Sequence, residues 1–310
     1  MNIVFLDTIT FGDEIDFKPI SNLGDVKMYS HTLPEERLVR CKEAEIIITN
    51  KVLIDKELLQ QLDKLRLVCI AATGTNNVDL EFAKSKGIVV KNAEDYSSNS
   101  VAQTTIQMAL HLMHRPWHYD AYVKNGDYAE SNSFCHIAHN FSEIAGKKYG
   151  IIGLGNIGRK VATIVEAFGA KVFYYSASGK NTDQPYTRLD LDELMQTCDI
   201  ISIHAPLNEH TKNLIAWKQL KQMQSHALLV NVGRGGIVVE SDLAKAIDEG
   251  LLAGAATDVY SEEPIKKDNT LIHVKKSDKL LLYPHIAWAS IESRNKLLHI
   301  IKDHILEFTK

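Results

Sequence analysis

The sequence predicts an α/β protein with two doubly wound domains, each built on a parallel β-sheet. Short runs rich in Val and Ile alternate with segments of helical period along most of the chain. The alternation stops once, at a long helical stretch that starts about a third of the way along the chain, and then starts again. The length of 310 residues also suits two domains better than one.

The first set of alternating elements precedes the long helix. Strand-like runs bounded by turn residues cover residues 3–6, 26–29, 45–49, 67–71 and 88–90. Segments with apolar residues at helical spacing lie between them, at residues 35–42, 56–62 and 80–86. Strands that alternate with helices in this way are typical of a parallel sheet.

The second set follows the long helix, which we predict over residues 98–118, and a polar stretch at residues 125–143. Its strand-like runs cover residues 149–152, 171–175, 199–203, 228–231, 254–257 and 279–282. A helix is predicted at residues 160–168 and a closing helix at residues 291–308. The periodicity alone leaves open which domain the closing helix packs on.

The composition excludes several classes of protein. Hydrophobic residues make up 45% of the chain and charged residues 24%, and both values are ordinary for a globular protein. The formal charge is −4 with no block of like charge, so neither nucleic acid nor a membrane surface is an expected partner. Residues 1–7 lack the basic region of a signal peptide, and the four cysteines are scattered. We therefore expect a cytoplasmic protein with free thiols.

A glycine-rich motif follows the first strand of the second set. Gly153, Gly155 and Gly158 form the pattern GxGxxG between the strand at 149–152 and the helix at 160–168. Such glycines allow a tight turn, let a pyrophosphate approach the backbone, and let the helix pack closely on the strand. The flanking strand and helix are the context that the motif requires, so a dinucleotide-binding loop is predicted.

The next strand, at residues 171–175, ends in Ser176, where an acid that binds the ribose hydroxyls is usual. Without a carboxylate there, nothing repels a 2′-phosphate, and Ser176, Ser178 and Lys180 could bind one. No arginine lies nearby in the sequence to bind a phosphate bidentately. The pattern favours NAD and leaves NADP open.

Polar residues follow the later strands, at the ends where open α/β sheets bind ligands. Arg234, Glu263 and His285 are the candidates for chemistry. Taken singly, each also fits an ordinary role: a surface cation, a solvated loop acid and a hydrogen-bonded loop histidine.

Several motifs in order nevertheless form one pattern. They are Ala72-Thr73-Gly74-Thr75-Asn76-Asn77-Val78-Asp79, the glycine loop, His204-Ala205-Pro206-Leu207-Asn208-Glu209-His210-Thr211, Gly233-Arg234-Gly235, residues 258–264 and Pro284-His285-Ile286-Ala287-Trp288-Ala289-Ser290. Over essentially the whole chain this pattern resembles the D-isomer-specific 2-hydroxyacid dehydrogenases. Within that family it is most similar to the glycerate dehydrogenases, also called hydroxypyruvate reductases.

The resemblance implies a Rossmann dinucleotide-binding domain over residues 99–286 and a flavodoxin-like substrate-binding domain over residues 1–98 with 287–310. It implies NAD(P)-dependent reduction of a small 2-keto acid, most closely hydroxypyruvate to D-glycerate, and a homodimer. Reduction of glyoxylate or another 2-keto acid is an alternative activity. A non-catalytic NAD(H)-sensing protein of the same fold is an alternative from another class.

The resemblance also assigns roles to the three polar candidates. His285 matches the acid/base histidine, Glu263 the carboxylate that pairs with it, and Arg234 the arginine that binds the substrate. These residue types suit the reaction, because hydride addition to a keto carbon leaves an oxygen that needs a proton. Imidazole can donate a proton near neutral pH, and a planar guanidinium matches a carboxylate.

Further site residues follow from the same resemblance. Thr73, Gly74 and Trp288 join Arg234 and His285 as substrate-binding residues, although Trp288 could equally pack against the closing helix. The residues implied to bind the cofactor are Gly153, Gly155, Asn156, Ile157, Gly158, Ser176, His204, Pro206, Thr211, Val232, Gly233 and Asp258.

A metal site is not expected. His111, His114 and His118 would lie near one face of the long helix, but no acidic residue accompanies them before Asp120. A packed or interfacial helix face explains these histidines better than a zinc site does.

Overall fold

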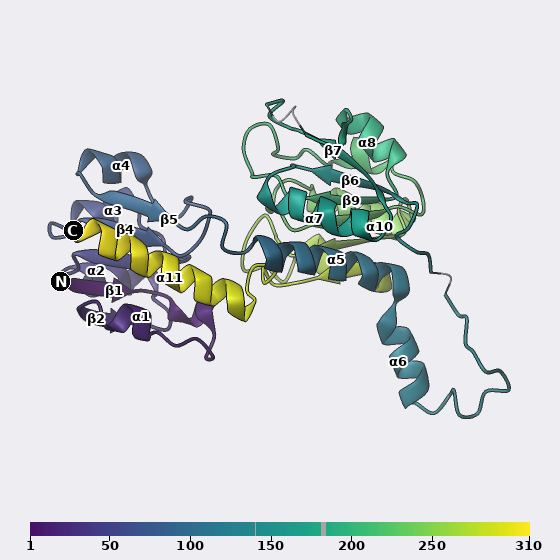
Figure 1. Ribbon diagram of the computed structural model, residues 1–310, viewed down its shortest axis with the longest axis horizontal. Coiled ribbons are helices and arrows are strands. Elements are labelled where there is room, and N and C mark those ends of the chain that lie inside the picture. The colour runs from purple at the N-terminus through teal and green to yellow at the C-terminus, as the bar shows by residue number, and fades with distance from the viewer. Residues whose placement is uncertain (140, 181–183) are drawn as a thin grey trace. The chain divides into compact units, whose positions relative to one another are not determined.

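The computed structural model describes residues 1–139, 141–180 and 184–310, and the chain divides into two units (Figure 1). Unit 1 comprises Met1–Ser97 and Ala289–Lys310, and unit 2 comprises Ser98–Trp288. Each unit contains its own parallel sheet with helices between successive strands.

The sheet of unit 1 has the strand order β2-β1-β3-β4-β5, which is the flavodoxin-like order. All of its neighbouring strands are parallel. The strands are β1 (Asn2–Phe5), β2 (Asp25–Met28), β3 (Ile46–Thr49), β4 (Leu67–Ile70) and β5 (Val89–Asn92). The helices are α1 (Lys18–Ser21), α2 (Arg37–Cys41), α3 (Lys56–Gln60), α4 (Leu80–Ser85) and α11 (Ile291–Phe308), with 3₁₀ turns at Thr8–Phe11 and Pro34–Glu36.

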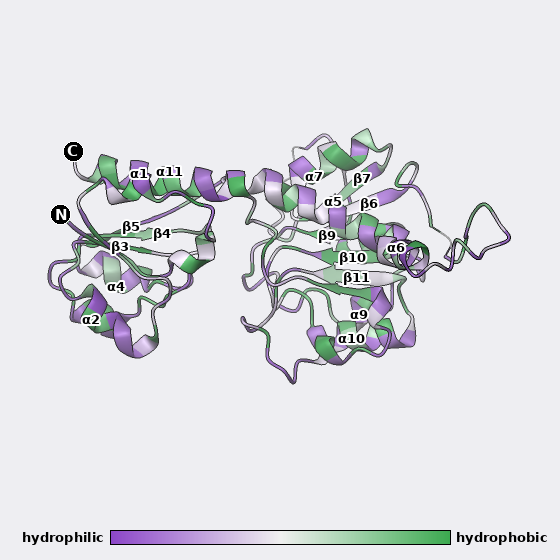
Figure 2. Cartoon of the chain, turned by 90° about the horizontal axis from the view of Figure 1, so that it is seen from below, coloured by the Kyte–Doolittle hydropathy of each residue, from purple (hydrophilic) through white to green (hydrophobic). Residues whose placement is uncertain are grey.

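Helix α11 covers the sheet of unit 1, where it packs against β4 and α1 (Figure 1). Ser290 caps its N-terminus, where the Ser290 side chain accepts a hydrogen bond from the Ser293 N–H. Polar and apolar residues alternate around the helix (Figure 2), and Leu297, Ile301 and Ile305 on its inner side are fully buried. The buried stripe resolves the question that periodicity left open, because α11 belongs to unit 1.

The sheet of unit 2 has the order β12-β11-β10-β9-β6-β7-β8. Its neighbouring strands are all parallel, and the order reverses between β6 and β9, as in a Rossmann sheet. The strands are β6 (Lys148–Ile152), β7 (Lys171–Tyr175), β8 (Thr187–Arg188), β9 (Ile200–Ile203), β10 (Leu228–Asn231), β11 (Gly254–Thr257) and β12 (Leu280–Leu282). The predicted fold class, two doubly wound parallel sheets, is confirmed.

The helices of unit 2 cover both faces of this sheet and bury two hydrophobic clusters against it. They are α5 (Ser98–His114), α6 (Pro116–Lys124), α7 (Asn156–Ala167), α8 (Leu191–Thr197), α9 (Trp217–Leu220) and α10 (Glu240–Glu249), with 3₁₀ turns at Thr270–His273 and Ser277–Lys279. Helix α7 begins at Asn156, four residues before the predicted start at residue 160. The last two glycine-motif positions are therefore at or inside the helix.

The single helix predicted over residues 98–118 was wrong. Helix α5 ends at His114, Arg115 adopts a left-handed backbone with φ of 48°, and α6 starts at Pro116. Proline lacks an N–H and disfavours helical backbone in the residue before it, so the helix breaks between Arg115 and Pro116. His118 consequently lies on a different helix from His111 and His114.

The described residues include no membrane-spanning helix. In those parts of the chain, no helix is both long enough and apolar enough to cross a bilayer.

Candidate active site

The glycine loop joins β6 to α7, and each of its glycines meets a different constraint. Gly153 has φ of +93°, and a Cβ there would lie 2.7 Å from the backbone nitrogen of Ala205. A Cβ at Gly158 would overlap the carbonyl of Gly153, so this glycine permits close packing of helix on strand. A Cβ at Gly155 would meet nothing within 4 Å. The middle glycine thus faces open space, where a ligand can approach the backbone.

The first turn of α7 can hold an anion. Asn156 and Ile157, both predicted cofactor residues, open this helix of 12 residues. No side chain caps the helix at Gly155, and the first N–H groups of any helix lack acceptors within the helix. Together with the helix dipole, they suit the pyrophosphate of a dinucleotide.

Ser176 lies at the end of β7, as predicted, and is only 6% exposed. Its carbonyl accepts a hydrogen bond of 3.1 Å from the Gly179 N–H, which closes a turn. Strand β8 then places Arg188 beside Tyr174, and a Cβ at Gly179 would lie 4.0 Å from Arg188 Nη2. The expectation of no nearby arginine holds for the sequence but not for the structure, because pairing of β7 with β8 brings Arg188 to this turn.

His285 and Glu263 form a hydrogen-bonded pair after β12 and β11. The His285 Nδ1 atom lies 2.7 Å from Glu263 Oε2, and the two side chains are 22% and 31% exposed. The second carboxylate oxygen of Glu263 accepts a hydrogen bond of 3.0 Å from the Tyr260 N–H, so the carboxylate is held in place. Because Nδ1 faces the carboxylate, Nε2 is the nitrogen that remains for a substrate.

Arg234 lies in the loop after β10. Asn231 holds this loop by donating from Nδ2 to the Arg234 carbonyl at 3.2 Å and accepting from the Gly233 N–H at 3.2 Å. Arg234 Nη1 donates to the Gly233 carbonyl at 2.8 Å. Within residues 1–139, 141–180 and 184–310, no carboxylate lies within ion-pair distance of this guanidinium. Its charge is therefore available to an external anion.

The loop that carries Arg234 contacts the loop that carries Glu263. A Cβ at Gly235 would overlap the carbonyl of Tyr260, so the two backbones touch there. Only glycine permits this approach. The contact brings the loops of two predicted catalytic residues together from strands β10 and β11.

Asp258 holds the segment that follows His285. Its carboxylate is 1% exposed and accepts hydrogen bonds from the Ile286 N–H at 2.7 Å and the Ala287 N–H at 2.9 Å. Burial raises the pKa of the Asp258 carboxyl, although these two N–H groups act in the opposite direction. Trp288 donates from Nε1 to the His285 carbonyl at 3.0 Å and packs against the core.

The loop after β9 contains three predicted cofactor residues. His204 Nε2 lies 2.9 Å from Ser202 Oγ, and burial lowers the pKa of His204 to about 3, so its ring is neutral. Thr211 is buried and donates from Oγ1 to the Pro206 carbonyl at 2.6 Å. Thr211 thereby stabilises the loop in which Pro206 is exposed.

Val232 and Gly233, in the loop after β10, contact the end of β9 and the loop that follows it. The Val232 N–H donates to the Ile203 carbonyl at 3.4 Å, and a Cβ at Gly233 would lie 2.9 Å from the Ala205 carbonyl. The predicted cofactor residues after β6, β9 and β10 therefore gather at the carboxyl edge of one sheet, on both sides of its switch point.

Thr73 and Gly74 belong to unit 1, in the loop that follows β4. Asn92 fixes this loop by donating from Nδ2 to the Thr73 carbonyl at 2.8 Å. Asn77 secures the other end by donating to the Val52 carbonyl at 3.1 Å. The loop lies at the carboxyl edge of the unit 1 sheet, with Thr73 exposed.

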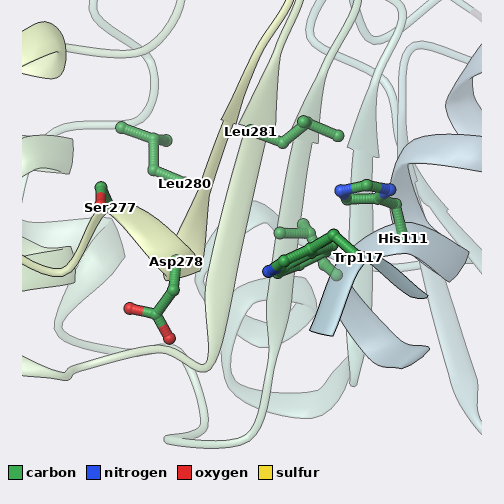
Figure 3. Close-up of a pocket in the computed structure, with 7 residues that line it drawn as sticks. His111, Trp117, Ser277, Asp278, Leu280 and Leu281 are labelled. Atoms are coloured by element: carbon green, nitrogen blue, oxygen red, sulfur yellow. The ribbon is translucent and has the colours of Figure 1, made fainter. Parts of the chain in front are cut away.

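A cavity of about 350 Å³ elsewhere in unit 2 contains none of the predicted site residues (Figure 3). His111 and Trp117 stack on each other in its lining, with ring centroids 4.3 Å apart. Ser277, Asp278, Leu112, Leu280 and Leu281 complete its lining. The catalytic candidates therefore define the site independently of this cavity.

Two of the histidines near α6 contact each other. His118 Nε2 lies 3.2 Å from His136 Nε2, a distance that one shared hydrogen explains. Across the described residues, no three His, Cys, Asp or Glu side chains come close enough together to hold a metal ion.

Comparisons with known proteins identify relatives of this chain. Residues 106–287 match the family described as D-isomer specific 2-hydroxyacid dehydrogenase, NAD binding domain. A glycerate dehydrogenase of Methylorubrum extorquens is 36% identical over 307 residues, which cover 99% of this chain and 95% of that protein. A hydroxypyruvate reductase of Blautia hydrogenotrophica is 35% identical over 318 residues, covering 100% of this chain and 97% of that protein.

One solved structure extends the comparison to the fold. An acyclic imino acid reductase in complex with NADPH and D-Arg superposes with a TM-score of 0.87 at 28% identity, covering 100% of this chain and 97% of that one. The fold, the glycine loop and the full-length relatives lead to one conclusion: the chain belongs to the D-isomer-specific 2-hydroxyacid dehydrogenases and is an NAD-binding oxidoreductase.

Proposed function

We propose that this chain reduces hydroxypyruvate to D-glycerate, with the dinucleotide bound at the glycine loop. The contact of 2.7 Å between His285 Nδ1 and Glu263 Oε2 carries the proposal. A histidine whose Nδ1 is held by a carboxylate presents Nε2 as a proton donor. The names of two full-length relatives, a hydroxypyruvate reductase and a glycerate dehydrogenase, support this keto acid.

The reaction needs a hydride at C2 of the keto acid and a proton on the C2 oxygen. The nicotinamide, when bound, supplies the hydride. His285 Nε2 donates the proton, and Glu263 stabilises the imidazolium before the transfer and holds the ring in its tautomer. After product leaves, the ring regains a proton from water.

Arg234 binds the substrate carboxylate through its planar guanidinium and polarises the adjacent carbonyl. Its lack of a carboxylate partner among the described residues supports this role. Thr73 and Gly74, in the loop after β4 of unit 1, are further proposed substrate-binding residues. The proposed cofactor contacts from the loops after β9, β10 and β11 are His204, Pro206, Thr211, Val232, Gly233 and Asp258.

A substrate panel tests the proposed activity. We expect the highest kcat/KM with hydroxypyruvate, compared with glyoxylate and pyruvate, when NADH oxidation is followed by absorbance. Chiral chromatography of the product identifies its configuration. A higher kcat/KM for glyoxylate would assign the chain to that substrate instead. Failure to oxidise NADH with every keto acid would support a dinucleotide-binding protein without this activity.

The cofactor site should discriminate weakly between NADH and NADPH, with NADH used. Ser176→Asp should raise the ratio of kcat/KM for NADH over NADPH about tenfold, because a carboxylate there would repel a 2′-phosphate. Arg188→Gln should raise the same ratio by a smaller factor, because Arg188 is exposed and screened by solvent.

A matched charge change serves as the control for this cofactor prediction. Lys221→Gln, directly after α9, removes one cation from unit 2 and should leave the ratio unchanged. An unchanged ratio in Ser176→Asp would mean that residue 176 does not face the ribose.

We also propose a cytoplasmic homodimer that forms through α6 and the loop after it. This segment projects from the rest of unit 2 (Figure 1), and it exposes Phe134, Ile137 and Phe141 at 91%, 75% and 59%. Apolar side chains gathered on a projecting segment favour contact with a second copy. Light scattering, which gives the mass in solution, measures this assembly.

A further inference from the structure

The backbone of His285 is left-handed, with φ of +56°. This conformation is uncommon outside glycine and costs free energy, so it persists only where neighbouring contacts enforce it. The backbone torsions of His285 determine the direction of its Cα–Cβ bond, and so the position of the imidazole ring. Contacts that hold those torsions therefore also aim Nε2.

Several hydrogen bonds hold the backbone on the C-terminal side of His285. Asp258 binds the N–H groups of Ile286 and Ala287. Ser100, on α5, donates from its hydroxyl to the Ala287 carbonyl at 2.7 Å. These bonds fix residues 286 and 287 but leave the carbonyl of His285 itself to another donor.

That donor is the indole of Trp288. Its Nε1 atom lies 3.0 Å from the His285 carbonyl oxygen. This carbonyl belongs to the same peptide group as the Ile286 N–H that Asp258 binds, so the two bonds hold one peptide plane from opposite sides. The indole packs against the buried cluster that contains Ala287, so the donor is rigid. A peptide plane held from both sides opposes rotation about the ψ torsion of His285, and so opposes relaxation of this residue out of the left-handed region.

We propose that Trp288 is a positioning residue, whose indole N–H holds the left-handed backbone of His285 and so aims Nε2 at the substrate oxygen. The proposal rests on the proposed function in one respect, that His285 is the proton donor. In this proposal Trp288 acts on the reaction through the backbone of His285, and not by contacting the substrate. Removing the N–H should thus affect proton transfer more than substrate binding.

Two substitutions separate the N–H from the ring. Trp288→Phe removes the donor and keeps an aromatic ring, and Trp288→β-(3-benzothienyl)alanine keeps the bicyclic shape while sulfur replaces the N–H. In both, we expect kcat to fall about 3–10-fold, the range of one lost hydrogen bond, while KM for the keto acid changes less than twofold. The primary isotope effect on kcat with 4-deuterated NADH should rise, because the chemical step becomes slower.

Trp217→Phe is the matched control, because Trp217 begins α9 and its ring faces Lys245 at 4.1 Å instead of the site. It should keep the parent kcat. Parent kcat in the benzothienyl variant would overturn the proposal. A raised KM with unchanged kcat would also overturn it and would make Trp288 part of the substrate pocket.

A measurement without substrate separates this inference from the proposed function. In ¹H–¹⁵N spectra, the His285 ring signals, assigned with His285→Asn, should shift in Trp288→Phe and stay in place in Trp217→Phe. Unshifted ring signals would overturn the positioning role whatever the enzyme reduces. If the parent reduces no keto acid but the His285 ring signals still shift in Trp288→Phe, only the proposed activity is refuted.

Discussion

Replacing His285 with asparagine is expected to lower kcat about 10²–10⁴-fold, the range typical for loss of a general acid. Asparagine is chosen because it tolerates the left-handed backbone that His285 adopts, with φ of +56°. The loss should therefore come from the missing proton donor and not from damage to the fold. Dinucleotide affinity, measured by fluorescence titration, should stay at the parent value.

The chain offers a matched histidine as the control. His226 Nε2 also lies 2.7 Å from a carboxylate, that of Asp199, but outside the proposed site. His226→Asn should leave kcat unchanged. Turnover near the parent rate in purified His285→Asn would remove His285 from the mechanism.

Arg234→Gln should lower kcat/KM for every keto acid about 10²–10³-fold, because it removes the charge and both bonds of the guanidinium fork. Arg234→Lys keeps the charge but not the fork, so we expect a loss of about tenfold or more. Steady-state kinetics at several keto acid concentrations should place most of either loss in KM for the keto acid. KM for NADH should hardly change.

Arg66→Lys is the corresponding control, since Arg66 lies over the ring of Phe308 in unit 1. It should behave as the parent enzyme. Parent kinetics in Arg234→Gln would show that another group binds the substrate carboxylate.

The central strands of the two sheets could be predicted because they are buried on both faces. In β3 and β4 every residue is buried, so each strand reads as an apolar run bounded by turns. The break at Arg115 could also have been predicted, since Pro116 marks it. The two-residue strand β8 has no periodic signal, and nothing local in the sequence indicated that Arg188 would lie beside the turn after Ser176.

The site depended on contacts between distant residues. Glu263 and His285 are 22 positions apart, and only the resemblance to a family suggested their pairing. The buried Asp258 was predicted to bind the cofactor, and the structure adds its two bonds to backbone N–H groups near His285. Backbone partners carry no sequence signal, because every residue except proline has an N–H. The proposed positioning role of Trp288 could not be predicted from the sequence either, because its hydrogen-bond partner is a backbone carbonyl.

The division of unit 1 into two segments has a consequence for biosynthesis. Unit 2 is continuous from Ser98 to Trp288, so the ribosome synthesises all of it before α11. The core of unit 1 is incomplete without α11, because Leu297, Leu298, Ile301 and Ile305 of this helix are all fully buried. Although unit 1 is begun first, the last core residues of unit 2 are therefore synthesised before the last core residues of unit 1. Until α11 is available, the buried residues of β4 that it packs against lack that cover.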